Sequence, residues 1–179
     1  GFVLIGVGAY SRDGIRSVAF YLLAYGLASV GAFGVVALVR ERAEGAGIVG
    51  EATALDRWRG LGRKDPFLAG AMAIFLLSFA GIPLTGGFIG KFQVFAAGVE
   101  GGLAVLVVLA VLASAATAFF YFRLILMMFF QEPDDYAVPV ASEGYSAVAI
   151  GVCAVGTLLL GIVPGPLMNF LGEAKAFML

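Results

Sequence analysis

Lys91 is the residue of this sequence whose type and surroundings most clearly predict chemistry. It is the only charged residue in the apolar stretch between Pro66 and Val99. A charge at bilayer depth costs at least about 2.5–3.5 kcal/mol, and such residues usually face an interior cavity and serve ion or proton movement. Burial disfavours the charged form of an amine. A lysine in this position is therefore expected to take up and release protons.

The residues before Lys91 predict an interruption of the helix. A proline cannot donate a helical hydrogen bond, and glycines adopt unusual backbone angles at low steric cost. Non-helical backbone at membrane depth is tolerated only where it is buried in protein or lines water. We expect the freed carbonyls, a threonine hydroxyl and the lysine to form one polar pocket. The residues expected at the break are Gly81, Pro83, Thr85, Gly86 and Gly87. Alternatively, Lys91 lies near the end of the span and extends to the membrane interface.

Other polar residues in the apolar segments give weaker signals. Tyr21, Tyr25 and Ser29 recur every four residues and share one helix face, which either lines an interior path or packs against another helix. Arg123 would be a candidate for the same proton path if it lay at the bilayer centre. It lies 20 residues into its segment, so we expect it to extend to the cytoplasmic side. Four further residues leave the same two interpretations open: Ser78, Gln93, Ser114 and Thr117.

The composition predicts an all-α integral membrane protein. Hydrophobic residues make up 61% of the 179 residues and charged residues 13%, whereas a soluble domain is about half apolar and a quarter charged. The apolar residues form blocks of about 20, long enough to cross a bilayer. The chain has no histidine and one cysteine, so we expect no metal or cofactor in it. It has no basic patch that would indicate nucleic-acid binding.

The apolar blocks divide a single membrane domain, residues 1–179, into five helical segments. We expect them at residues 1–9 (the end of a helix whose start is missing), 18–39, 66–99 (broken near 81–87), 103–130 and 145–163. The 40–65 loop holds six Lys/Arg and is expected in the cytoplasm. A 34-residue helix would be about 50 Å long. The broken segment is therefore expected to cross once, as two half-helices, which places the C-terminus outside.

The stretch "LLSFAGIPLTGGFIGKFQVF" resembles the antiporter-like membrane subunits of respiratory complex I, the proton-pumping NADH–quinone oxidoreductase. The similarity extends to "FYLLAYGLASVGAFGVVALV", "WRGLGRKDPFLAGAMAIFLLSFAGIP", "YFRLILMMF" and "LLLGIVPGPL". Within this family, M-type subunits resemble "GEF" where this chain has "GKF", and L-type subunits continue into a long lateral helix. Only 16 residues follow Val163 here. The resemblance is therefore to the subunit N group.

This resemblance implies a polytopic bundle of antiporter-like inverted repeats, each with a discontinuous helix. The chain would be the C-terminal part of such a subunit in a bacterial cell membrane, with Lys91 as its proton-channel lysine. Its partners would be other complex I membrane subunits, the lipid bilayer and protons. NADH, FMN, iron–sulfur clusters and quinone would bind elsewhere in the complex. The chain would then be a non-redox subunit of the enzyme.

Three alternatives remain at this stage. The first is a subunit of a multi-subunit cation/proton antiporter, which shares this ancestry and differs in its driving force. The second is the membrane arm of a hydrogenase-type complex. The third, of a different class, is a structural membrane scaffold in which the lysine is inert.

Overall fold

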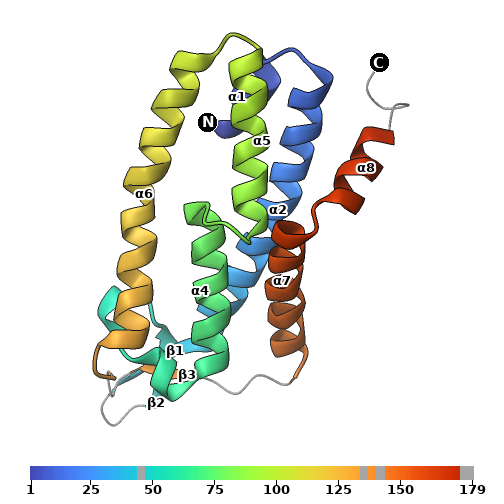
Figure 1. Ribbon diagram of the computed structural model, residues 1–179. Helices are drawn as coiled ribbons and strands as arrows, with labels where there is room; N and C mark the ends of the chain where they lie inside the picture. Colours follow the sequence, from blue (N-terminus) through green and yellow to red (C-terminus); the bar gives the residue numbers. More distant parts are fainter. Residues whose placement is uncertain (44–46, 134–136, 140–143, 174–179) are drawn as a thin grey trace.

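The computed structural model describes residues 1–43, 47–133, 137–139 and 144–173. Its helices are α1 (Phe2–Gly8), α2 (Arg12–Leu38), α3 (Leu61–Lys64), α4 (Pro66–Ala80), α5 (Gly86–Glu100), α6 (Ala104–Phe130), α7 (Tyr145–Ile162) and α8 (Gly165–Glu173), with one 3₁₀ helix, η1 (Leu55–Trp58). Its strands are β1 (Val39–Ala43), β2 (Gly47–Glu51) and β3 (Ala137–Pro139). Long helices form a bundle, and the three strands lie at one end of it (Figure 1).

Helices α4 and α5 follow one another along the bundle, and the non-helical segment between them lies at mid-height (Figure 1). Each has 15 residues and rises about 22 Å, less than the roughly 30 Å of a hydrocarbon core. Within the described residues, three helices are long and apolar enough to cross a membrane: α2, α6 and α7. The stacked pair runs alongside α6 (Figure 1).

The starts of α2 and α4 follow from local capping. The Ser11 hydroxyl accepts a hydrogen bond from the Gly14 N–H at 3.0 Å, so α2 begins at Arg12 and not at residue 18, as expected from the apolar run alone. The charged residues of "RDGIR" form its first turns. At α4, the Asp65 carboxylate accepts from the Leu68 N–H at 3.0 Å, and Pro66 occupies the first helical position.

The 40–65 segment is not the plain loop that was expected. It contains β1, β2, η1 and α3, and the strands form an antiparallel sheet in the order β2-β1-β3. Two ion pairs support it, Arg40–Glu51 at 3.8 Å and Arg57–Glu41 at 2.8 Å. A second correction concerns the end of the chain, where α8 follows α7 after the break at Val163–Pro164. Proline is tolerated in the first turn of a helix, so "PGP" ends α7 without preventing α8.

Helix α2 lies at the centre of the packing, in contact with α1, α4, α5, α7 and α8. The largest apolar cluster is in the half of the bundle next to the sheet, where Val35, Phe75 and Met128 are completely buried. A smaller cluster joins α1, α2, α5 and α6 through Ile5, Tyr21, Val94 and Val107. The break between α4 and α5 lies between these two layers, so rigid packing holds it from both sides.

Candidate functional site

The break begins where Gly81 adopts a left-handed conformation, with φ +81°. The Ile82 N–H then donates to the Leu77 carbonyl at 3.0 Å, a common way for a glycine to end a helix. Residues 81–85 are not helical, and α5 starts at Gly86. In a continuous helix the Phe79 carbonyl would accept from the N–H of residue 83. Because residue 83 is proline and has no N–H, that carbonyl is free for another donor.

Lys91 fills this vacant position on the Phe79 carbonyl. Its ammonium donates to the Phe79 oxygen at 2.6 Å and to the Ser114 hydroxyl at 2.9 Å. The Phe2 ring centroid lies 5.2 Å from the same nitrogen. The lysine is only 8% exposed. Its side chain thus points inward, joining α5 to the end of α4 and the middle of α6, and does not extend to the end of the bundle.

The charge of Lys91 is balanced by dipoles and an aromatic ring. Within the described part of the chain it forms no ion pair, and both of its hydrogen bonds go to neutral oxygens. A pocket of about 310 Å³ opens beside it toward α6. It is lined by Ala80, Gly81, Phe88, Lys91, Phe92, Phe95, Val111, Ser114 and Ala115. A pocket of this size has room for several water molecules next to the amine.

The small residues at the start of α5 allow it to pack closely. The Gly87 N–H donates to the Ser78 hydroxyl at 3.0 Å, and a Cβ at position 87 would collide with the Ser78 carbonyl. At Gly86 an added Cβ would make tight contacts, 3.0 Å from the Leu160 Cβ and 3.2 Å from the Ala24 Cβ. Thr85, expected to face the lysine, instead donates to the Ile82 carbonyl at 2.7 Å within the break. The hydroxyl that contacts Lys91 comes from Ser114, a residue for which the sequence gave only a weak signal.

The other residues singled out in the sequence divide into two groups. Tyr21 and Tyr25 stack at 5.7 Å, and they contact Phe2 at 5.9 Å and Phe79 at 5.4 Å, respectively. Tyr21 thus touches the Phe2 ring beside the Lys91 amine, and Tyr25 touches the ring of Phe79, the residue whose carbonyl binds that amine. Ser29 is half-buried two turns beyond Tyr21, outside these contacts. Arg123 lies nine residues beyond Ser114 on α6, about 13 Å along the helix, so it is not brought to Lys91.

Residues 1–117 match the family model of the NADH:quinone oxidoreductase/Mrp antiporter transmembrane proteins. The chain belongs to this family. A curated relative, NADH-quinone oxidoreductase subunit N of Beutenbergia cavernae, is 53% identical over 99% of this chain and 34% of its own length. The chain thus spans about a third of that relative, and its resemblance to subunit N is confirmed.

Two solved structures share the fold of this family member. Respiratory complex I from Thermus thermophilus with bound aureothin matches 94% of this chain and 36% of its own at 30% identity, with a TM-score of 0.78. The Mrp complex from Dietzia sp. DQ12-45-1b matches 98% of this chain and 40% of its own at 22% identity, also with a TM-score of 0.78. The predicted class of polytopic helical membrane protein is confirmed. With its apolar helices, the chain is a multi-pass membrane protein similar to bacterial ones.

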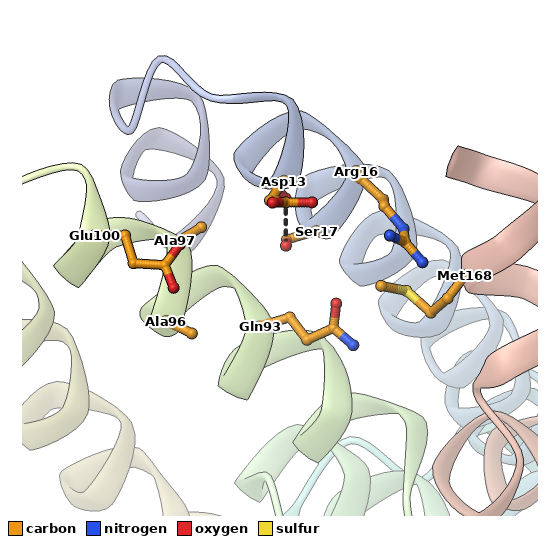
Figure 2. Close-up of a pocket in the computed structure, with 8 residues that line it drawn as sticks. All are labelled: Asp13, Arg16, Ser17, Gln93, Ala96, Ala97, Glu100 and Met168. Carbon is orange, nitrogen blue, oxygen red and sulfur yellow. Dashed lines mark hydrogen bonds between the residues drawn. The ribbon is translucent and has the colours of Figure 1, made fainter. Parts of the chain in front are cut away.

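A second polar pocket of this family member was not predicted from its sequence. It has a volume of about 160 Å³ and lies between the start of α2, the end of α5 and α8 (Figure 2). Asp13 and Arg16 come from α2, and Gln93 and Glu100 from α5. The Arg16 Nε is buried without a hydrogen-bond partner among the described residues. The signal was present in the charged stretch "YSRDGIR", which lies between the helices expected at 1–9 and 18–39.

Proposed function

We propose that this chain is the C-terminal part of a proton-translocating membrane subunit of NADH-quinone oxidoreductase, with Lys91 as a proton carrier. The observation that carries the proposal is the pair of hydrogen bonds from the Lys91 ammonium to the Phe79 carbonyl and the Ser114 hydroxyl. A buried lysine held at a helix break is the arrangement expected of a relay in a membrane protein. The similarity to subunit N supports the choice of enzyme.

The geometry gives the lysine two distinguishable states. The protonated amine has three N–H donors, of which two bind protein oxygens, leaving one for water in the adjoining pocket. A neutral amine binds these two oxygens more weakly, because hydrogen bonds from a charged donor are about twice as strong. Loss of the proton therefore loosens the link between α5 and α4. In this proposal the proton path next to Lys91 runs past Tyr21 and Tyr25. The helix break is kept in place by Gly81, Pro83, Thr85, Gly86 and Gly87.

The rest of the proposal concerns the assembly around the chain. The end of the bundle with the sheet and six basic residues faces the cytoplasm, and the C-terminus lies outside. The broken segment of residues 66–99 crosses the bilayer once, between the spans at 18–39, 103–130 and 145–163. Other membrane subunits of the complex pack against this chain. Electrons pass from NADH through FMN and iron–sulfur clusters to quinone in other subunits, so this chain takes part as a non-redox subunit.

A second candidate function is cation/proton exchange driven by an ion gradient. It is favoured by the family itself, which includes Mrp antiporter subunits, and by the equal TM-score of the Dietzia Mrp complex. The same lysine geometry would serve either function. Only the driving force distinguishes them.

The test uses inverted membrane vesicles that carry the full-length subunit in its assembled complex. Lys91→Ala should lower both NADH oxidation and NADH-driven acidification of the vesicles. Arg63→Ala, which also removes one positive charge but from the exposed face of α3, should leave both near wild type. If acidification is unchanged in an assembled Lys91→Ala complex, Lys91 is not the carrier. Proton release driven by a cation gradient, abolished by Lys91→Ala, would then support the antiporter. No effect in either assay would leave a structural role.

A further inference from the structure

A third pocket lies at the C-terminal end of α6, where that helix meets η1. It has a volume of about 420 Å³ and is lined by Asp56, Arg59, Phe119, Phe122, Arg123, Leu126, Met127 and Gln131. Phe119, Phe122 and Leu126 are spaced three and four residues apart and form one stripe on α6. Their side chains are exposed on the outside of the bundle, Phe119 by 65% and Leu126 by 54%. The pocket thus combines polar walls with an apolar strip that continues along a membrane helix.

Two guanidinium groups face this pocket from separate elements. Arg123 is the only charged residue of α6, and it forms neither a hydrogen bond nor an ion pair with any described residue. Arg59 pairs with the Asp56 carboxylate at 2.7 Å. Among the described residues that line the pocket, Asp56 is the only acid. The described lining therefore carries one net positive charge, and Arg123 is its group without a counter-charge.

The pocket is formed before any ligand arrives. The Gly60 N–H donates to the Met127 carbonyl at 3.0 Å, which fixes the segment after η1 on the last turns of α6. The buried Trp58 indole donates to the Ala52 carbonyl at 3.1 Å and anchors η1 to the residue that follows β2. Arg59 lies between these two anchors, so its backbone is held facing the end of α6. A ligand would not need to order this loop.

We propose that this pocket binds the headgroup of an anionic phospholipid. The phosphate would accept hydrogen bonds from the Arg123 and Arg59 guanidinium groups, whose planar donors suit phosphate oxygens. One acyl chain would lie along Phe119, Phe122 and Leu126. Basic pockets at the ends of membrane helices are suited to such lipids. A zwitterionic headgroup fits less well, because its ammonium needs a carboxylate and Asp56 is already paired with Arg59. A free phosphate would leave the apolar strip unused.

The proposal is tested by photo-crosslinking on the full-length protein in its purified complex. The probe is phosphatidylglycerol with a photoactivatable acyl chain, and the labelled peptide is mapped by mass spectrometry. We expect label on α6 within residues 119–126. Arg123→Gln should lower the labelling about five-fold, the effect of one basic residue near an anionic lipid. Arg123→Lys keeps the positive charge, so its labelling should stay closer to that of the wild type. Labelling of this variant also shows that the protein still folds when Arg123 is replaced.

The matched control is Arg63→Gln, on the exposed side of α3 and outside the pocket lining. It should label like wild type, and a phosphatidylcholine probe with the same acyl chain should label weakly. Three results would overturn the proposal. The first is equal labelling of Arg123→Gln and Arg63→Gln. The second is equal labelling by the two lipids. The third is loss of label in excess inorganic phosphate, which would indicate a phosphate site.

Discussion

The Lys91 ammonium lies 2.6 Å from the carbonyl oxygen of Phe79, twelve residues earlier in the chain. This bond joins the two half-helices across their break. It exists because Pro83 has no N–H to occupy that carbonyl in the helical pattern. The proline and the lysine therefore act on the same atom: one frees the Phe79 oxygen and the other binds it. If Lys91 is the proton carrier proposed above, we expect its protonation and the relative position of α4 and α5 to be coupled through this contact.

Ser114→Ala should slow proton translocation without preventing assembly. It removes the Lys91 acceptor on α6, 2.9 Å away, and leaves the Phe79 carbonyl in place. A hydrogen bond to a charged group contributes about 1.5–3 kcal/mol, so the protonated lysine is held less tightly. The loss of NADH-driven vesicle acidification should be smaller than for Lys91→Ala. Ser114→Thr retains a hydroxyl and should restore part of the activity.

The matched control for Ser114→Ala is Thr117→Ala. Thr117 lies on the same helix and is exposed, and its hydroxyl donates to the Ser114 carbonyl rather than to Lys91. Acidification should be close to wild type in this variant. Equal rates in the two alanine variants would show that the Ser114 hydroxyl has no part in the function.

The chemistry of the break is visible in a single sequence because it is local. Pro83 and Gly81 act on their own turn of backbone, and Lys91 is conspicuous as a lone charge in an apolar run. The partners of the lysine are different. Ser114 lies 23 residues further on, and Phe2 belongs to another helix, so only the packing of α1, α5 and α6 brings them together. Spacing within one segment cannot reveal such contacts.

The ends of the helices were harder to predict for a different reason. Arg12, Asp13 and Arg16 lie outside the helix expected at 18–39 from the apolar run, yet the Ser11 cap starts α2 ahead of them. Asp13 and Arg16 face the polar pocket at the end of α5, where charge is tolerated (Figure 2). The pairing of β1 with β3 could not be predicted from the sequence because the two strands lie almost 100 residues apart in the chain. Hydropathy identifies the apolar middle of a span but not the residues and strands at its ends.

Leu84→Val should destabilise the protein, whereas Leu84→Gly should not. Leu84 has φ +73°, a conformation that is costly for residues with a Cβ and more so for β-branched ones. Its backbone packs against Gly161 of α7, so it cannot relax by moving outward. We expect Leu84→Val to cost about 1 kcal/mol. Apparent melting temperatures of the purified complex measure this. A glycine variant that melts below the valine variant would contradict the strain argument.

Gly87→Ala should reduce the stability of the subunit. The added Cβ would meet the carbonyl and the hydroxyl of Ser78 in α4. A carbonyl of the main chain cannot turn aside as a flexible side chain can, so α5 must shift and lose the 3.0 Å bond from the Gly87 N–H to Ser78. Such overpacking typically costs about 1–3 kcal/mol.

Gly70→Ala is the matched control for Gly87→Ala. Gly70 lies inside α4, and a Cβ there meets no atom within 4 Å. Alanine favours the helix over glycine by about 0.5–1 kcal/mol, so this variant should melt at or above the wild-type temperature. Gly87→Ala should melt lower and yield less assembled complex on gel filtration. If the two variants melt together, the contact between α4 and α5 at Ser78 is looser than the hydrogen bond implies, and Lys91 must hold the half-helices together alone.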